Sequence, residues 1–286
     1  MDQATATATS ILGRSGSVYD SVEATRRPMR RSLVEVLRYR DFLRLQVVTN
    51  IRGRYKRSVL GVAWSLLSPL LTMIVMSIAF SAIFRFSVPN YPVYVLAGLV
   101  FFGFFQETTT QSMRSLVFGG SLLKKVYVPA ATFPLSSVGT GLVNLGLTLV
   151  PIVFIMLVLG HNFTWAFFFV PVGTLLIAVF SLGVGLIMAT LAVFFSDVVE
   201  MWGVLVRALF YLTPVMYPEE ILPERFVWIV TANPLYHLLR CWRDPIYLGT
   251  SPPLSSVAVA TATSVGVLVI GWWVFCRHSH EFALRA

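Results

Sequence analysis

Six long apolar stretches decide what this chain can fold into. They lie at about residues 61–84, 93–114, 130–159, 165–195, 199–217 and 254–275. About 20 helical residues cross the roughly 30 Å hydrocarbon core of a bilayer, where only helices and closed barrels satisfy their own backbone groups. Charged residues make up 12% of the chain, about half of the roughly 25% in soluble domains. The sequence therefore predicts an all-α integral membrane protein with six transmembrane helices and disfavours a large soluble helical bundle.

Basic residues are concentrated before the first of these spans. Residues 1–58 hold 12 of the 22 Lys and Arg residues. Residues 1–31 have the polar composition of a disordered tail, which we expect to be cytoplasmic because it lacks the apolar core of a signal peptide. Residues 32–58 follow an amphipathic pattern, which predicts a helix lying at the membrane interface, with a solvated charged face as the alternative. Residues 59–286 then form the predicted transmembrane domain.

The distribution of charge also predicts the orientation in the membrane. With the N-terminus inside, seventeen basic residues fall on the cytoplasmic side and four fall outside, namely Arg85, Arg225, Arg240 and Arg243. The positive-inside rule favours this topology, in which both termini are cytoplasmic. Residues 218–253 would then be external. Prolines divide this apolar segment into halves too short to span, which predicts two short re-entrant helices between the fifth and sixth spans.

Motifs of enzymes and nucleotide-binding sites are absent from the sequence. It contains no G-x-x-x-x-G-K-[ST], H-E-x-x-H or G-x-S-x-G motif, so we expect a chain that is not an enzyme and binds no ATP or other cofactor itself. The two cysteines and four histidines lack metal-ligand spacing, which predicts no metal site. The net charge of +9 indicates attraction to anionic membrane lipid rather than to nucleic acid.

The second span has a polar second half that begins near Glu107. A charge at bilayer depth costs at least about 2.5 kcal/mol, so Glu107 should face protein or a water-filled path. Either these polar groups line a hydrophilic channel or they hold neighbouring helices together. Arg207 in the fifth span is a candidate partner for Glu107. Some aromatic rings could stack on sugars, although most should belong to the interfacial belts. The predicted channel-lining residues are Glu107, Thr110, Gln111, Arg207, Phe105 and Tyr211.

Three stretches of the sequence resemble one transporter family. They are RYKRSVLGVAWSLLSPL at 54–70, LLKKVYVP at 122–129 with FPLS at 133–136, and TPVMYP at 213–218 followed by NPL at 233–235. Their order resembles the permease subunits of type-2 ABC exporters, in the branch that exports lipid-linked polysaccharides such as O-antigen, teichoic acid and galactan. After the fourth span this family commonly has Arg-Asp, whereas this chain has Ser196-Asp197.

The resemblance implies a complete transport system around this chain. Two copies of the permease would assemble with two copies of a separate ABC ATPase, which would bind ATP and Mg²⁺, in the bacterial inner (cytoplasmic) membrane. The cargo would be a polysaccharide on an undecaprenyl-pyrophosphate carrier, taken from the cytoplasmic leaflet. Residues 115–129 would dock on the ATPase, and residues 218–253 would form helices of an external gate.

The resemblance also assigns roles to individual residues. The predicted docking residues are Leu122, Leu123, Lys124, Lys125, Val126 and Tyr127. The predicted gate residues are Pro218, Trp228, Asn233 and Pro234. The candidates for the entrance of the lipid pyrophosphate are Arg52, Arg54, Lys56 and Arg57. Their charges suit an anionic head group, with positive-inside anchoring as the other explanation.

Other functions remain open on the sequence. One alternative is an ABC permease for a drug or small lipid. A channel or secondary carrier is disfavoured because no inverted repeat is visible. A membrane-embedded transferase acting on lipid-linked sugars would need clustered acids or histidines, and only Asp197, Glu200 and Glu107 come close. Copurification with an ATPase would distinguish an exporter from these alternatives.

Overall fold

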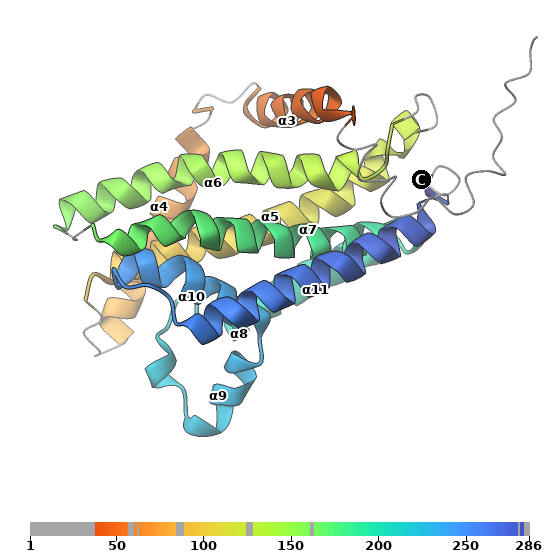
Figure 1. The fold of residues 1–286 in the computed structure, drawn as a ribbon. Helices are drawn as coiled ribbons and strands as arrows, with labels where there is room; N and C mark the ends of the chain where they lie inside the picture. The colour runs from red at the N-terminus through yellow and green to blue at the C-terminus, as the bar shows by residue number, and fades with distance from the viewer. Residues whose placement is uncertain are drawn as a thin grey trace, which may run out of the picture.

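The computed structural model describes residues 38–56, 60–61, 63–83, 89–123, 128–160, 163–279 and 281–282. Within these ranges the protein contains nine α-helices, α3 to α11, two short 3-10 helices and no β-strand (Figure 1). The all-α expectation is therefore confirmed for the described residues. The predicted tail, residues 1–31, lies outside them. The predicted interfacial segment contains α3 (Arg40–Tyr55), which packs against α6.

Five helices in the described residues are long and apolar enough to cross a membrane. They are α4 (Ala63–Ile83), α5 (Tyr91–Leu123), α6 (Thr132–Val158), α7 (Val170–Phe194), which directly follows the 3-10 helix η2 (Trp165–Phe169), and α11 (Leu254–His278). Their positions agree with five of the six predicted spans. However, α5 continues beyond the predicted end at residue 114. The first part of the predicted docking segment is therefore the end of this helix, while Lys124, Lys125, Val126 and Tyr127 lie outside the described residues.

The helix found at the predicted fifth span, 199–217, is shorter than expected. This helix, α8 (Val198–Leu212), has 15 residues, which at 1.5 Å per residue extend for about 22 Å. The predicted end at residue 217 is wrong because Pro214 has no N–H to donate and disfavours helical geometry at the preceding residue. Thr213 is accordingly extended, with ψ of 131°. The described residues thus contain five helices of spanning length, with α8 as a shorter sixth element.

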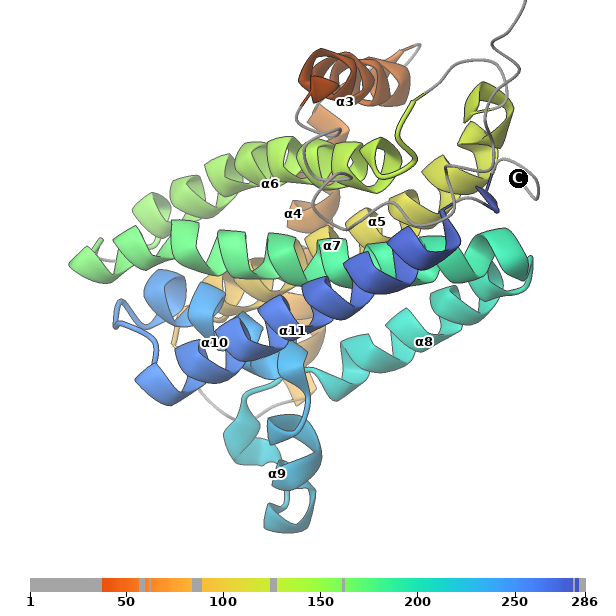
Figure 2. The same cartoon turned by 45° about the vertical axis from the view of Figure 1, so that its right-hand side comes forward.

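Short helices fill the segment between α8 and α11. They are the 3-10 helix η3 (Glu219–Ile221), α9 (Glu224–Thr231) and α10 (Pro234–Tyr247). Helix α10 begins where Asn233 Oδ1 accepts a hydrogen bond from the Leu235 N–H at 3.0 Å, a favourable N-cap. It packs against α5, α7 and α11. Helix α9 instead projects away from the bundle (Figures 1 and 2).

The long helices form a bundle around α5, α6, α7 and α11. The α7–α8 turn and the end of α11 lie at one end of the bundle, whereas α10 and the α6–α7 connection lie at the other (Figures 1 and 2). Most positions of α5 are buried, whereas those of α4 from Ala63 to Phe80 are half-buried or exposed except for Met73.

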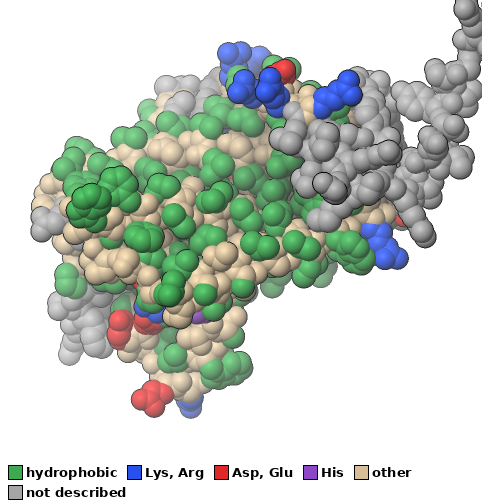
Figure 3. Space-filling view, in the orientation of Figure 1, with side chains coloured by type: hydrophobic (Ala, Val, Ile, Leu, Met, Phe, Trp, Pro, Cys, Tyr) green, Lys and Arg blue, Asp and Glu red, His purple; other side chains and the backbone are tan. Residues whose placement is uncertain are grey.

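Side chains on the surface are arranged as a bilayer requires. Figure 3 shows a face of the long helices with mainly hydrophobic and neutral side chains. Lys and Arg gather over α3, and charges of both signs gather beside α9 and α10 (Figure 3). On α4, Val75 and Ile78 are 63% and 67% exposed. Such exposed apolar surface needs lipid or another protein to cover it.

Close approach of α7 and α11 depends on Gly183. A Cβ atom at this position would lie 2.6 Å from the Leu268 backbone nitrogen and 2.7 Å from the Val267 carbonyl carbon. We expect Gly183→Val to push the helices apart and destabilise the protein by about 3 kcal/mol, measured as a lower Tm of the detergent-solubilised chain. Gly266→Val on α11 is the control because no atom lies within 4 Å of its added Cβ. Equal Tm values for the two variants would contradict the close packing.

Candidate functional site

A cavity of about 610 Å³ lies between α4, α5 and α6, beside the end of α3. Its polar lining comes from four helices and consists of Arg54, Ser65, Ser68, Thr72, Gln106, Glu107, Asn144 and Thr148. Aromatic side chains, among them Trp64, Phe102 and Phe104, form other parts of the wall. The volume is within the range of about 300–1,000 Å³ that small-molecule sites occupy. The mixture of hydroxyl, amide and aromatic groups suits a ligand with both polar and apolar surfaces.

One ion pair stands in this cavity. The Arg54 guanidinium group contacts the Glu107 carboxylate, and Asn144 Nδ2 donates to the same carboxylate oxygen at 3.3 Å. The two charged side chains are 38% and 37% exposed. Ion pairs this accessible contribute only about 0–1 kcal/mol, so a stronger anion could displace Glu107 from Arg54. The structure therefore pairs Glu107 with Arg54 rather than with Arg207, which is exposed on α8.

Helix α3 places Arg54 by resting on α6. Asn50 Nδ2 donates to Thr140 Oγ1 at 3.4 Å, and the Val47 side chain lies against Gly139. Of the three predicted entrance residues that the structure describes, only Arg54 lines the cavity. Arg52 and Lys56 are exposed, and Arg57 lies outside the described residues.

The polar half of α5 serves two purposes. Gln106 and Glu107 line the cavity, whereas Thr109 and Ser112 are fully buried. Trp202 of α8 donates its Nε1–H to Thr109 Oγ1 at 3.1 Å. Part of this polar segment therefore joins helices, and part faces the cavity.

The other predicted channel residues lie apart from this cavity. Phe105 is 1% exposed and packs against Phe180 and Trp202, so its ring faces side chains of the same chain. Thr110 and Gln111 are half-buried outside the cavity lining. Tyr211, on α8, is 66% exposed.

The hydroxyl groups that α4 brings to the cavity were not predicted from the sequence. Ser65, Ser68 and Thr72 are spaced by three and four residues, which places them on one face of a helix. This spacing could have identified them in an otherwise apolar span. It could not have identified Asn144 and Thr148 of α6 as their neighbours, because that depends on how the helices pack.

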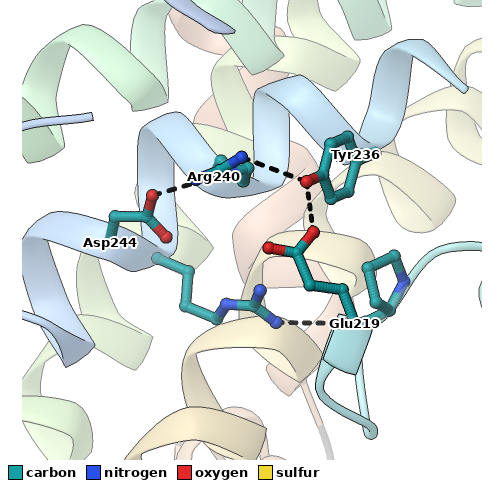
Figure 4. Close-up of polar contacts among 6 residues, drawn as sticks. Glu219, Tyr236, Arg240 and Asp244 are labelled. Carbon is teal, nitrogen blue, oxygen red and sulfur yellow. Dashed lines mark hydrogen bonds and ion pairs between the residues drawn. The ribbon is translucent and has the colours of Figure 1, made fainter. Parts of the chain in front are cut away.

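A second polar cluster lies around α10 (Figure 4). The Tyr236 hydroxyl forms a short hydrogen bond with the Glu219 carboxylate. Arg240 donates to the Tyr236 hydroxyl at 3.1 Å and to Asp244 Oδ2 at 3.4 Å. Burial raises the pKa of Tyr236 to about 12 and also raises the pKa of Asp244. Arg243 donates to the Pro214 carbonyl at 2.7 Å, so the cluster fastens the segment after α8 to α10.

The predicted gate residues occupy different positions around this cluster. Asn233 is buried, and besides capping α10 it donates to Thr213 Oγ1 at 2.9 Å. Pro234 starts α10, and Pro218 is half-buried beside the cluster. Trp228 lies on α9 with 67% of its surface exposed. Asn233 and Pro234 thus position α10, whereas Trp228 is available for contact with other molecules.

The part of the chain that matches known proteins includes both the larger cavity and the polar cluster around α10. The pattern of the family described as ABC-2 type transporter matches residues 43–247. The chain is 30% identical over 245 residues to the O-antigen export system permease protein RfbA of Klebsiella pneumoniae, covering 84% of this chain and 93% of that protein. The protein of the same name from Myxococcus xanthus is 30% identical over 261 residues, covering 89% and 99%. The polysialic acid transport protein KpsM of Escherichia coli is 24% identical over 224 residues, covering 75% and 86%.

Proposed function

The chain belongs to the ABC-2 type transporter membrane family, and from this membership we propose that it is the permease subunit of an ATP-driven polysaccharide exporter. Similarity to permeases named for O-antigen and polysialic acid export supports this class of cargo. The structural observation that carries the proposal is the cavity of about 610 Å³, whose hydroxyl and amide groups come from α4, α5 and α6.

The cargo that this cavity fits best is a polysaccharide on an undecaprenyl-pyrophosphate carrier. Arg54 is the one cationic side chain among the described residues that line the cavity. A diphosphate accepts charge-assisted hydrogen bonds from a guanidinium group and carries more charge than a single carboxylate. It would therefore compete with Glu107 for Arg54. Exposed α4, along one side of the cavity, leaves room for a lipid tail to remain in the bilayer.

The surface of the chain supports assembly with further subunits. On helix α8, the exposed fractions of Met201, Val204 and Tyr211 are 67%, 60% and 66%. We propose that a second copy of the chain covers such apolar surface in a homodimer. Two copies of a separate ABC ATPase, carrying ATP and Mg²⁺, would dock on residues 115–129. The complex would lie in the bacterial inner membrane, with both termini of the permease in the cytoplasm.

The transferase alternative receives no support from the described residues. It would need acids or histidines gathered at the cytoplasmic surface, whereas the three carboxylates that share one cavity, Glu219, Glu220 and Asp244, lie beside α10 in the segment proposed to be external. Glu107 is held by Arg54 within the cavity. Asp197 and Glu200 are exposed at the start of α8.

Coupling to an ATPase tests the proposed function directly. We expect the permease, coexpressed with the ABC ATPase encoded beside it, to purify as a complex that hydrolyses ATP. The double change Lys124→Ala and Lys125→Ala should lower this activity about five-fold or more, because it removes two charges from the proposed docking segment. ATP hydrolysis by the detergent-purified complex is the measurement.

Arg225→Ala is the control for this experiment. Arg225 lies on exposed α9, which projects below the bundle and away from the end of α11 (Figure 1). This change should leave both complex formation and ATP hydrolysis intact. A permease that never retains an ATPase would contradict the proposed function.

A further inference from the structure

The charged residues around α10 enclose a cavity of about 370 Å³. It lies between η3, α10 and the start of α5, and none of the described residues that line it also lines the larger cavity. Figure 4 shows Glu219, Tyr236, Arg240 and Asp244 converging where α10 faces η3. The volume is near the lower end of the range for small-molecule sites. A ligand of this size corresponds to about one or two sugar rings.

The lining of this cavity combines hydrogen-bonding groups with aromatic rings. Three carboxylates and two guanidinium groups line it, belonging to Glu219, Glu220, Asp244, Arg240 and Arg243. Such planar groups can hydrogen bond through two atoms at once, which suits neighbouring hydroxyl groups on a sugar. The lining thus offers both the donors and the acceptors that a hydroxyl-rich ring requires.

Two tyrosines supply the aromatic part of the wall. The Tyr94 hydroxyl donates to the Tyr217 carbonyl at 2.8 Å, and the Tyr247 hydroxyl donates to the Pro89 carbonyl at 2.8 Å. These bonds use the polar ends of the side chains for anchoring. The Tyr94 ring is buried, with the Arg243 guanidinium 4.1 Å from its centroid, so the half-buried ring of Tyr247 supplies the apolar surface of the cavity for the C–H groups of a sugar ring.

Asp244 indicates that the cavity is built for a ligand. The residue is 5% exposed and lines the cavity. Among the described residues, its carboxylate receives one hydrogen bond from another side chain, the 3.4 Å contact from Arg240, although a carboxylate offers about four acceptor sites. Buried polar groups are normally satisfied. Hydroxyl groups of a ligand in the cavity would donate to the remaining acceptor sites of this carboxylate.

We infer that this cavity binds a sugar ring of the exported glycan and that it favours neutral or amino sugars over acidic ones. The inference rests on the proposed function for the source of the sugar. The preference follows from charge, because carboxylates outnumber guanidinium groups among the described residues that line the cavity. Glu220 is exposed there and forms no ion pair within the described part of the chain. It would attract an amino group and repel a uronic acid.

Binding of simple sugars to the detergent-purified full chain tests this inference. The probes are methyl glucoside, glucosamine and glucuronate, titrated by calorimetry. We expect saturable binding of the first two and at least ten-fold weaker binding of glucuronate. Glu220→Gln should reduce the discrimination between glucosamine and glucuronate about five-fold or more, and Asp244→Asn should weaken methyl glucoside binding about five-fold.

Glu224→Gln is the matched control, because Glu224 is an exposed acid on α9 outside the cavity lining. If the Asp244→Asn protein does not fold, Glu220→Gln, at an exposed position, still tests the site through its effect on the discrimination between glucosamine and glucuronate. Absence of saturable binding, preference for glucuronate, or unchanged affinities in Glu220→Gln would overturn the site. Normal glycan export by an Asp244→Asn permease that folds and shows the expected loss of sugar affinity would overturn the assignment to the exported glycan. None of the binding measurements needs the ATPase, so failure of the complex to form would count against the proposed function alone.

Discussion

Replacing Arg54 with alanine is expected to lower polysaccharide export by at least ten-fold while leaving the protein folded. Hydrogen bonds to charged groups contribute about 1.5–3 kcal/mol, and about 1.4 kcal/mol corresponds to a ten-fold change. Arg54 is the cationic group at the larger cavity, among the described residues that line it. Its removal should therefore weaken capture of an anionic lipid head group. The measurement is glycan reaching the cell surface in a strain that depends on this permease.

Two further variants separate charge at the cavity from charge at the membrane surface. Arg44→Ala removes an exposed arginine from the same helix at a position outside the cavity lining, and export should persist. Glu107→Gln removes the carboxylate of the ion pair and keeps the arginine, so export should again persist. Equal losses in Arg54→Ala and Arg44→Ala would indicate general membrane anchoring. Equal losses in Arg54→Ala and Glu107→Gln would indicate that the ion pair itself is what matters.

The difference between Arg54 and its neighbours shows where prediction from sequence ends. Clustered positive charge was visible in the sequence, and so was an acid inside the second span. The pairing of these charges was not visible in the sequence, because Arg54 and Glu107 meet only when α3 packs against α6 through Asn50 and Thr140. Arg207 was a reasonable candidate on hydropathy alone. Helix packing decides which of two distant cations reaches a carboxylate, and a single sequence does not contain that information.

Helix positions were more predictable than the contacts between helices. Apolar length alone located α4, α6, α7 and α11, because a bilayer imposes nearly the same length on every span. The end of α8 was predicted too late, although Pro214 marks it, because apolar residues continue to Tyr217. Phe105 was predicted to line a channel because aromatic composition does not distinguish a lining ring from a buried one. Its partners Phe180 and Trp202 come from other helices.

Trp242→Ala is expected to destabilise the protein by about 3–5 kcal/mol, the range for truncating a large buried aromatic side chain. Trp242 is 0% exposed and donates its Nε1–H to the Ala97 carbonyl of α5 at 3.1 Å. It therefore anchors α10 in the core of the bundle. The measurement is the Tm of the detergent-purified chain, compared with that of Trp228→Ala. Trp228 on α9 is 67% exposed, so its loss should change stability by about 0.5 kcal/mol or less.

This pair of tryptophans tests whether the two short helices have different roles. If both variants unfold at the same temperature, α10 is not embedded as the structure describes, and the cavity beside it loses its support. If only Trp242→Ala is destabilised, α10 is a fixed wall and α9 is the part free to contact other molecules. Arg243 and Asp244 directly follow Trp242 on this wall. Loosening α10 should therefore also weaken sugar binding in the smaller cavity. A change at the exposed residue Glu220 tests that cavity more cleanly, because it leaves the packing of α10 intact.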